Sequence, residues 1–493
     1  MSVRLNRKPL VFYPNPKRTI TRFYFTDDEK ATQVIQKVLK LSPDEIYFEL
    51  QRVLRDFSTR HRQITKVFET HFNNVKRLFK SIKVDPESLP DNTKLLIGAY
   101  FTHEYSVEAA AYFNPSIVEH PDQHGLAENE KRIIVSFRAT GEGHISSIVF
   151  REGVIDANNN LLFKEPGNLD EMPECVKRTI YNKKSFTRKL DEMDIHKDIV
   201  NLVLDKLKSK FTYGELQAAI SETLKDVTLT PTKRKVIEEI NWVADSHYEM
   251  TFSLDTSLSE RVIFPISYSE RNGIEDARFV KFTDDDGEVT YYATYTAYNG
   301  YAILPKLIST KDFYYFKISP LNGIYAQNKD MALFPRKING KYVMVGRYDG
   351  VNNYIMFSDQ VNLWKEARLL QQPSFPWEFI QIGNSGSPIE TPEGWLLITH
   401  GVGPMRSYSL GAILLDLEQP EKVIGHLKYP LMVPNDKERE GYVPNVIYSC
   451  GSIIHNNELI IPYAMSDYAS SFVTVPLHEL LDELKNNHQK NNE

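Results

Sequence analysis

The fold is most clearly indicated by Tyr291-Tyr-Ala-Thr-Tyr-Thr-Ala-Tyr298, in which aromatic residues alternate with small and β-branched ones. This alternation is typical of a β-strand with a buried face. Similar runs recur along the chain and are bounded by turn residues such as Gly, Asn and Asp. The other runs are Arg132-Ile-Ile-Val-Ser-Phe-Arg138, Tyr342-Val-Met-Val-Gly-Arg347, Trp395-Leu-Leu-Ile-Thr-His400 and Leu459-Ile-Ile-Pro-Tyr-Ala464.

The spacing of these runs indicates a repeat. From residue 291 onward they begin about 50 to 65 residues apart, which is the period expected of propeller blades, each a four-stranded sheet. Five runs predict a mainly β protein, a five-bladed β-propeller, with a helical insertion after its first blade. A pair of β-sandwiches would give a similar pattern and remains the alternative.

Two stretches outside the repeat read as helical. Ser42-Pro-Asp-Glu45 is a capping box with proline at the first helical position, and apolar residues follow it at helical spacing as far as about residue 83. A second stretch, about 185–245, contains the capping box Thr212-Tyr-Gly-Glu215 and the helix start Thr230-Pro231. We therefore expect an N-terminal arm with helices (1–92), a propeller catalytic domain (93–480) interrupted by a helical insertion (165–247), and a polar C-terminal tail (481–493).

Composition limits the class of protein. The 493 residues carry a formal charge of −6, with 41% hydrophobic and 25% charged residues, as in an ordinary globular protein. Such a charge argues against a general nucleic-acid binder. Aromatic residues make up 12%, with 27 Tyr and 26 Phe but only 4 Trp, which favours strands and a concave site.

The sequence also predicts a location. Two cysteines are too few for a disulfide framework, the charged N-terminus has no apolar segment behind it, and no apolar run reaches the length of a membrane span. We expect a cytoplasmic protein without a membrane partner. Scattered histidines predict no metal site.

Polar residues follow the repeated strands, and equivalent strands of a propeller converge on its axis. We therefore expect one cluster at one end of the channel, although turn-forming residues at strand ends would give the same pattern. These residues are Arg138, Asn299, Arg347, His400 and Asp467. Gly273-Ile-Glu-Asp-Ala-Arg278 adds two carboxylates and a guanidinium, a combination that can hold one acid protonated beside an ionised one.

Together these segments resemble glycoside hydrolase family 130 over roughly residues 95–480. The matching pieces include Phe113-Asn-Pro-Ser116, Gly273-Ile-Glu-Asp-Ala-Arg278 (the family's Glu-Asp-Pro-Arg), Asn328-Lys-Asp-Met331, His400-Gly-Val402, Tyr408-Ser-Leu-Gly-Ala412, Glu440-Gly-Tyr-Val-Pro-Asn-Val446 and Asp467. The resemblance implies a five-bladed propeller acting on β-mannosides. The helical additions lie outside the shorter members and look like those of a long subgroup.

The resemblance also implies residue roles. It makes Asp276 the general acid, which in phosphorylases of the family is thought to act through a sugar hydroxyl. It assigns the substrate-binding role to Asn114, Ser116, Arg138, Glu275, Arg278 and Asp467. The side that receives phosphate or water is assigned Lys329, Asp330, Arg347, Gln381, His400 and Tyr408.

Two departures from the family pattern bear on the choice between water and phosphate. Gln381 replaces an expected lysine and Ala277 an expected proline, and a lost cation weakens the binding of a dianion. Glu378 is a candidate for activating water. We therefore expect an inverting hydrolase that cleaves β-mannosides, most plausibly β-1,2-linked, from the non-reducing end.

The alternatives are a phosphorylase releasing mannose 1-phosphate and a non-catalytic glycan-binding propeller; retention of Asp276 favours an enzyme. No cofactor is expected, with inorganic phosphate as co-substrate if the protein is a phosphorylase. The expected partner is an oligosaccharide, with no nucleic acid, and homo-oligomerisation through the helical additions is a further expectation.

Overall fold

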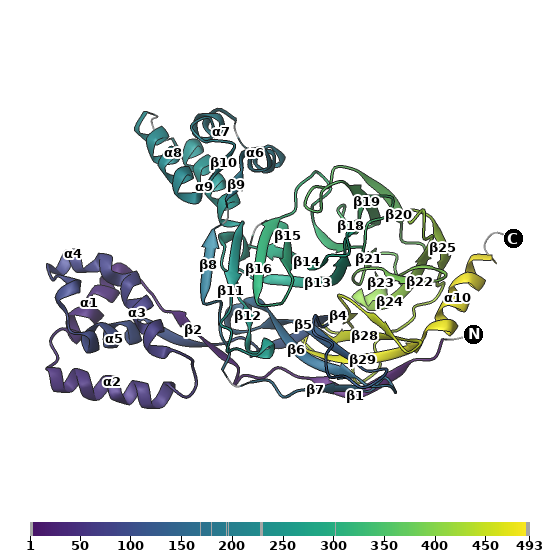
Figure 1. Ribbon diagram of the computed structural model, residues 1–493, viewed down its shortest axis with the longest axis horizontal. Helices are drawn as coiled ribbons and strands as arrows, with labels where there is room; N and C mark the ends of the chain where they lie inside the picture. The colour runs from purple at the N-terminus through teal and green to yellow at the C-terminus, as the bar shows by residue number, and fades with distance from the viewer. Residues whose placement is uncertain are drawn as a thin grey trace.

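A computed structural model describes residues 3–167, 169–178, 180–193, 195, 197–226, 230–300 and 302–489. The fold is mainly β with additional helices, as predicted. Most strands belong to five antiparallel sheets of four to six strands, which follow one another around a common centre (Figure 1). Among the described residues, no helix is long and apolar enough to span a membrane.

The first sheet has the order β4, β5, β6, β12, and the second the order β13, β14, β15, β16, β11, β8. The strands of the first are β4 (Ala111–Glu119), β5 (Lys131–Thr140), β6 (Ser146–Ile155) and β12 (Val262–Ile263), with β7 (Leu161–Phe163) beside β6. Those of the second are β13 (Ile274–Thr283), β14 (Val289–Tyr298), β15 (Ile303–Thr310), β16 (Tyr315–Pro320), β11 (Tyr248–Thr251) and β8 (Cys175–Arg178).

The remaining three sheets repeat this order of antiparallel strands. The third contains β17 (Lys329–Leu333), β18 (Tyr342–Arg347), β19 (Asn353–Ser358) and β20 (Ala367–Gln371). The fourth contains β21 (Gln381–Asn384), β23 (Gly394–Val402), β24 (Tyr408–Leu415) and β25 (Val423–His426), with β22 (Ile389–Thr391) beside β23. The fifth contains β26 (Ile447–Tyr448), β28 (Glu458–Met465), β29 (Ala469–Pro476) and β1 (Asn6–Phe12), with β27 (Ile453–His455) beside β28.

Each of the five runs singled out in the sequence forms the second strand of one sheet, namely β5, β14, β18, β23 and β28. Neighbouring sheets pack together: β4 lies beside β13, β14 beside β17, β17 beside β21, and β24 beside β26. The fifth sheet then returns to the first, because β28 also packs against β4. The first strands of the sheets therefore lie around one centre.

The fifth sheet is completed by the start of the chain. β1 pairs with β29 in antiparallel register, with Asn6 opposite Thr474 and Phe12 opposite Ser470. β1 lies within the stretch 1–92 that was expected to be an arm, so that stretch contributes a strand to the β body as well as the helices. Two apolar side chains of β1, Leu10 and Phe12, pack against the core of the first sheet.

The helical arm follows β1 and is carried by a ribbon of two strands, β2 (Thr19–Phe23) and β3 (Thr102–Ser106). Its helices are α1 (Asp28–Val38), α2 (Pro43–Phe57), α3 (Ile64–Val75), α4 (Phe79–Ile82) and α5 (Asp91–Tyr100). The predicted capping box forms at the start of α2: Ser42 Oγ accepts from the amide of Glu45 at 3.3 Å, and Glu45 accepts from the amide of Ser42 at 2.7 Å.

The helical insertion lies between β8 and β11, which are paired to each other at the outer edge of the second sheet. It contains β9 (Tyr181–Asn182), α6 (Lys183–Glu192), α7 (Lys197–Leu204), β10 (Lys210–Phe211), α8 (Tyr213–Asp226) and α9 (Pro231–Asp245), around a core of its own. The capping box predicted at Thr212 and the helix start predicted at Thr230 are both present.

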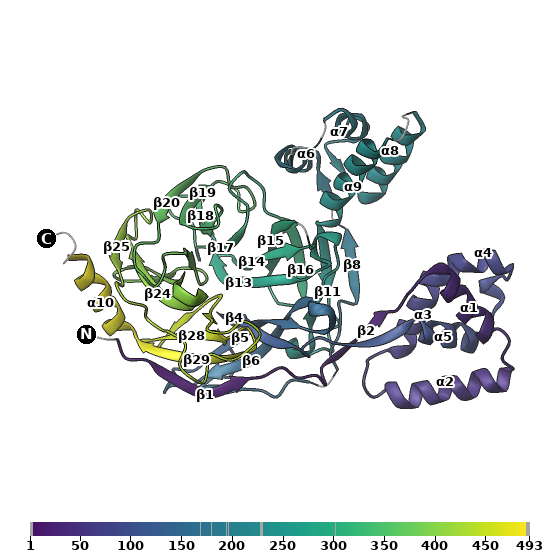
Figure 2. The same ribbon diagram turned by 180° about the vertical axis from the view of Figure 1, so that it is seen from behind.

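The two helical additions project from one side of the β body (Figure 2). The last helix, α10 (Leu477–Gln489), lies near the opposite side and packs on β25. It occupies most of the stretch expected as a polar tail, and residues 490–493 of that stretch lie outside the described residues.

Candidate active site

The predicted site residues gather at one end of the ring of sheets. First strands begin at this end and second strands end at it, because the two are antiparallel. Asn114, Glu275, Asp276, Lys329, Asp330 and Gln381 lie near the starts of β4, β13, β17 and β21. Arg138, Arg347 and His400 lie near the ends of β5, β18 and β23, Tyr408 begins β24, and Asp467 follows β28.

Three of these residues lie at the same backbone irregularity in three different sheets. Asn114, Asp276 and Asp330 have φ angles of 48°, 55° and 64°, in the left-handed region. Each coincides with a register shift between the first and second strands of its sheet. A β-bulge re-aims a side chain away from the strand's alternation, and left-handed backbone at a non-glycine residue is a strain that functional sites often hold. The three bulges therefore direct polar side chains toward one place.

Asp276 is the centre of the first group of contacts. Its Oδ1 accepts from Asn114 Nδ2 at 2.6 Å and lies 3.3 Å from Arg138 Nη1. Burial alone would raise the pKa of Asp276, but Arg138, Lys329 and Arg278 outweigh that effect and hold the pKa below its ordinary value. Asp276 is thus a buried, ionised carboxylate in the unliganded protein.

Glu275 joins this group to the neighbouring sheets. It accepts from Arg138 Nη2 at 2.9 Å and from Lys329 Nζ at 2.8 Å, so one carboxylate holds two cations from the first and third sheets. The guanidinium carbon of Arg138 also lies 4.9 Å from the centre of the Phe113 ring, a cation–π contact that fixes its plane.

Asp330 is the centre of a second, fully buried group. Its Oδ1 accepts from Arg278 Nη2 at 2.7 Å and from the Tyr448 hydroxyl at 2.9 Å. Its Oδ2 lies 2.7 Å from Arg347 Nε. Burial opposes ionisation of Asp330, but Arg347 and Arg278 hold its pKa far below the ordinary value. Such a carboxylate is a structural anion and a poor proton acceptor near neutral pH.

His400 lies beside this group and is neutral. Burial lowers the pKa of His400 to about 4, and the nearby Arg347 and Arg278 act in the same direction. Its Nδ1 lies 3.1 Å from the carbonyl oxygen of Asn384, which can only accept, so Nδ1 carries the proton and Nε2 is an acceptor. Nε2 is buried, has no hydrogen-bond partner among the described residues and lies 3.7 Å from Asp330 Oδ2. The family resemblance places His400 among the basic residues of the phosphate side, whereas burial and the two arginines keep its imidazole uncharged.

Gln381 and Tyr408 lie next to each other on the same side as His400. Gln381 Nε2 donates to the Tyr408 hydroxyl at 3.4 Å, and the Tyr408 ring stacks on the His400 ring at 6.1 Å. The amide that replaces the expected lysine is therefore held by the predicted tyrosine.

Asp467 has the opposite electrostatic surroundings to Asp276. Burial raises the pKa of Asp467 to about 6, and the negative charge of Asp276 adds to this, while Arg138 partly opposes it. The two carboxyl groups thus differ widely in acidity although both face Arg138. Environments that push neighbouring carboxyl pKa values apart are typical of acid–base sites.

Two expected residues have other partners. The hydroxyl of Ser116 accepts from the amide of Phe279 at 3.0 Å and is fully buried, so Ser116 links β4 to β13 beneath the site. Asn299 Oδ1 accepts from the amide of Ala302 at 2.8 Å and closes the turn after β14.

Sequence reasoning missed two residues of the site. Tyr448 donates to Asp330 and accepts from Arg278 Nη2 at 2.6 Å, and it was not among the residues expected in the site. Asn384 was not expected in the site either, yet its side chain donates to the Asp330 carbonyl and its own carbonyl accepts from His400. The sequence signal for Asn384 was its place directly before Ser385-Gly-Ser387. The sequence contains no comparable signal for Tyr448.

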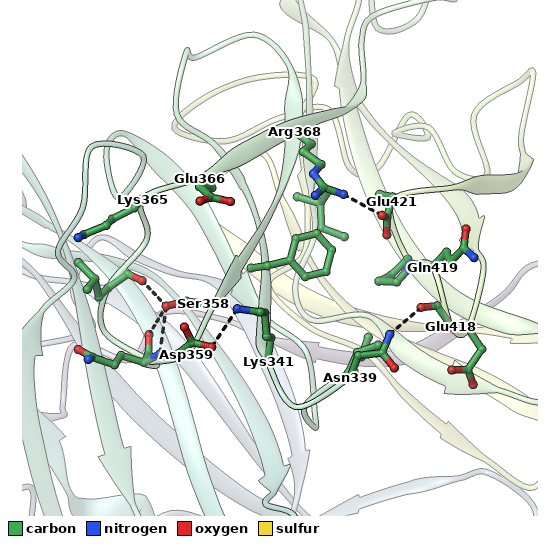
Figure 3. A pocket seen from close by; sticks show the side chains of 16 residues that line it. Asn339, Lys341, Ser358, Asp359, Lys365, Glu366, Arg368, Glu418, Gln419 and Glu421 are labelled. Atoms are coloured by element: carbon green, nitrogen blue, oxygen red, sulfur yellow. Dashed lines mark hydrogen bonds and ion pairs between the residues drawn. The ribbon is translucent and has the colours of Figure 1, made fainter.

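A separate polar cleft of about 490 Å³ lies between the third sheet and the turn after β24 (Figure 3). Lys341 pairs with Asp359 and Arg368 with Glu421 across it. It contains none of the predicted site residues. Among the described residues, no three side chains of the His, Cys, Asp or Glu type gather as metal ligands do.

The sequence is similar to a known enzyme family and to several named enzymes. Residues 249–486 match glycoside hydrolase family 130, described as β-1,4-mannooligosaccharide phosphorylase. The 1,2-β-oligomannan phosphorylase of Thermoanaerobacter sp. is 38% identical over 40% of this chain, and the match spans 66% of that relative. The β-1,2-mannobiose phosphorylase of Listeria innocua is 27% identical over 68% of this chain and 91% of its own length.

A solved structure of the Listeria innocua β-1,2-mannobiose phosphorylase with β-1,2-mannobiose is also similar, with a TM-score of 0.45 at 22% identity over 77% of this chain and 93% of that one. The family match covers the second to fifth sheets apart from β8 and β1, and with them Asp276, Asp330 and His400. Residues 249–486, which hold these three residues, therefore match the enzymes of glycoside hydrolase family 130.

Proposed function

We propose that the protein is an inverting phosphorylase that transfers a β-linked mannosyl unit from the non-reducing end of an oligosaccharide to inorganic phosphate. The five sheets act in this proposal as the five blades of a propeller whose channel mouth is the active site. From the sequence alone we expected a hydrolase. The relatives named above and a further one are phosphorylases by name, and this favours phosphorolysis. A β-1,2 linkage is the finer part of the proposal, supported by two of these relatives.

The observation that carries the proposal is the division of the site into two sides. Asp276, Asn114 and Arg138 form one side. Lys329, Arg347 and the unpartnered Nε2 of His400 form the other. Four cations (Arg138, Arg278, Lys329, Arg347) meet the carboxylates Glu275, Asp276 and Asp330 here, so charged donors for an anion are concentrated at this place.

The chemistry of each side fits one half of the reaction. Lys329 and Arg347 would hold phosphate oxygens, and the acceptor atom His400 Nε2 would receive a hydrogen bond from the P–OH group of hydrogen phosphate. Asn114, Arg138 and Asp467 would hold the mannosyl hydroxyls. An oxygen of phosphate then attacks the anomeric carbon from the face opposite the leaving sugar, which inverts the configuration.

The proton balance closes without another reactant. The bond from the anomeric carbon to the leaving oxygen breaks, the bond to phosphate forms, and the proton that hydrogen phosphate brings replaces the one given to the leaving oxygen. Asp276 is ionised in the unliganded protein because of three cations. A bound phosphate dianion offsets those cations and so raises the pKa of Asp276, which favours the protonated form that serves as general acid, directly or through a sugar hydroxyl.

Hydrolysis would require a base for water on the phosphate side. Asp330 is held by Arg278, Arg347 and Tyr448 and is too weak a base. Glu378 accepts from the amides of Ser374 and Phe375 at 2.8 and 3.2 Å, so it caps the turn that contains it. Burial raises the pKa of Glu378, and its second oxygen has no partner in the described part of the chain, which keeps it the best candidate base if the protein hydrolyses mannosides.

The test of the proposal is a comparison of two variants. Glu378→Gln removes the candidate base for hydrolysis and leaves both sides of the proposed phosphorylase site intact. We expect phosphate-dependent formation of mannose 1-phosphate to survive in Glu378→Gln and to be lost in Lys329→Met. Loss of activity in Glu378→Gln with retention in Lys329→Met would support hydrolysis instead.

A further inference from the structure

We propose that the helical insertion positions the phosphate side of the active site, through Lys189 and Glu192 at the end of α6. Both are positioning residues, because they contact the backbone of the loop that leads into β17 and do not contact the site itself. This inference rests on the proposed phosphorylase function.

The contacts are direct and specific. Glu192 Oε1 accepts from the amide of Gly323 at 2.7 Å. Lys189 Nζ donates to the carbonyl of Leu321 at 2.9 Å and to Glu192 Oε2 at 3.3 Å. Lys189 is 6% exposed, so its ammonium group is held inside the contact between insertion and β body. A buried cation and a charge-assisted hydrogen bond to a backbone amide are costly to leave without partners.

The loop that they hold has little freedom on its other face. The amide of Asn322 donates to Asn362 at 2.8 Å, and the amide of Trp364 donates to Asn322 at 2.7 Å. Gly323 has a φ of 106°, and an added Cβ would meet the Trp364 carbonyl. The loop is thus clamped between the third sheet on one side and α6 on the other.

The same loop delivers two residues of the site. Six residues after Gly323 the chain reaches Lys329, the cation that binds Glu275, and then Asp330 at its left-handed bulge. Asp330 is held by Arg278, Arg347 and Tyr448, whereas the ammonium of Lys329 is bound to Glu275 alone among the contacts described above. Release of Gly323 would therefore displace Lys329 more than Asp330, and more than Asn114 or Arg138, which lie in the first sheet.

A second contact ties the insertion to the loop before β13. Ser246, which follows α9, donates to Ser269 Oγ at 3.3 Å. The adjacent Glu270 accepts from Lys306 Nζ and the hydroxyls of Tyr295 and Tyr248, all within the buried core of the second sheet. The loop before β13 thus has a fully buried anchor of its own in Glu270, whereas the loop before β17 is held by α6 on one face and by backbone contacts of the third sheet on the other.

The experiment measures KM separately for phosphate and for the mannoside, in the full-length protein. In Glu192→Ala we expect the KM for phosphate to rise about tenfold and the KM for the mannoside to change by less than about twofold, since one charge-assisted hydrogen bond is lost on one side of the site. Glu192→Gln keeps an oxygen acceptor for Gly323 and should restore most of the phosphate affinity. Lys189→Met should resemble Glu192→Ala.

The matched control is Lys206→Met, which removes an ion pair with Glu222 inside the same insertion and away from the β body. We expect both of its KM values to stay as in the wild type. Equal changes of both KM values in Glu192→Ala, no change in either, or failure of Glu192→Gln to restore phosphate affinity would overturn the inference. A wild-type protein that cleaves mannosides without phosphate would overturn the proposed function, and this inference with it. Wild-type phosphorolysis with unchanged variants would overturn the inference alone.

Discussion

The acidity of individual carboxyl groups decides what the site can do. Asp276 and Asp467 both face Arg138, yet the pKa of Asp276 is held low and that of Asp467 is raised to about 6. The difference arises because Asp276 also faces Lys329 and Arg278, while for Asp467 burial and the charge of Asp276 dominate. One carboxyl group is therefore ready to exchange a proton as ligands change the local charge.

The first prediction concerns Asp276→Asn. The amide keeps the hydrogen bond with Asn114 but cannot transfer a proton, so we expect kcat to fall roughly 10³-fold. Calorimetric titration with the mannoside should give a dissociation constant close to that of the wild type. Asp359→Asn, an 80% exposed side chain outside the site, is the control. Retained turnover in Asp276→Asn would show that Asp276 is not the general acid.

The second prediction concerns pH. Below about pH 6 Asp467 is protonated, and above it the group is ionised and accepts stronger hydrogen bonds from sugar hydroxyls. The kcat/KM for the mannoside should therefore rise as the pH increases through about 6. Asp467→Asn should lower kcat/KM and flatten that part of the profile. A profile of unchanged shape in the variant would contradict the assigned role.

Much of the site could be predicted at this scale, because its motifs are local. Asn114, Arg138, Asp276 and Lys329 do come together. The charge state of His400 could not be predicted, since it depends on burial and on two arginines from other sheets. The structural role of Ser116 could not be predicted either, because the amide that donates to it lies 163 residues away in the sequence.

At the scale of elements, the bulge at the start of β13 depends on Gly273. This residue has a φ of 135°, its amide donates to Glu270 at 2.7 Å, and the next carbonyl accepts from Ser146 at 3.0 Å. An added Cβ would come within 2.4 Å of Ser146 Oγ. The turn that presents Glu275 and Asp276 is thus built on a position that favours glycine.

The third prediction follows from this turn. Gly273→Ala should displace Asp276 and lower kcat by roughly 10²-fold, because small displacements of a reacting group are costly. Gly287→Ala is the matched control: its φ is 84°, but no atom of the residues that the structure describes lies within 4 Å of an added Cβ. Kinetic assays of both variants, with melting curves to verify folding, make the comparison. Equal activities of the two variants would contradict it.

The second strands of the sheets could be predicted because their alternation and turn residues are local signals. β1 could not, because its partner β29 lies more than 450 residues away and nothing in the Asn6–Phe12 stretch specifies that pairing. β8 was hidden for a similar reason: its partner β11 lies beyond the whole helical insertion.

For the whole molecule, β1 joins the two ends of the chain. Arg7 donates to Glu438 at 2.9 Å, and β1 covers the edge of β29, which would otherwise expose unpaired backbone groups. The ring of sheets is therefore held closed by the residues that precede the arm.

The fourth prediction tests this closure. A chain that starts at Tyr13 should melt several degrees below the full-length protein, since it loses a strand and its apolar contacts. Arg4→Ala removes only an exposed ion pair with Glu479, and its melting temperature should not change. Differential scanning calorimetry gives both values. An unchanged melting temperature of the shortened chain would show that β1 does not hold the ring.

The overall charge of −6 gave little information about function, because the cations that matter are gathered at one end of the ring. They pair there with Glu275, Asp276 and Asp330. This concentration of charge, set by five sheets that meet at one centre, is the basis for assigning phosphate as the second substrate.

The most direct test is to identify the product formed from β-1,2- and β-1,4-mannooligosaccharides with and without inorganic phosphate. We predict that α-mannose 1-phosphate and a shortened oligosaccharide form only when phosphate is present. Release of free mannose at the same rate without phosphate would contradict the proposal that the protein is a phosphorylase.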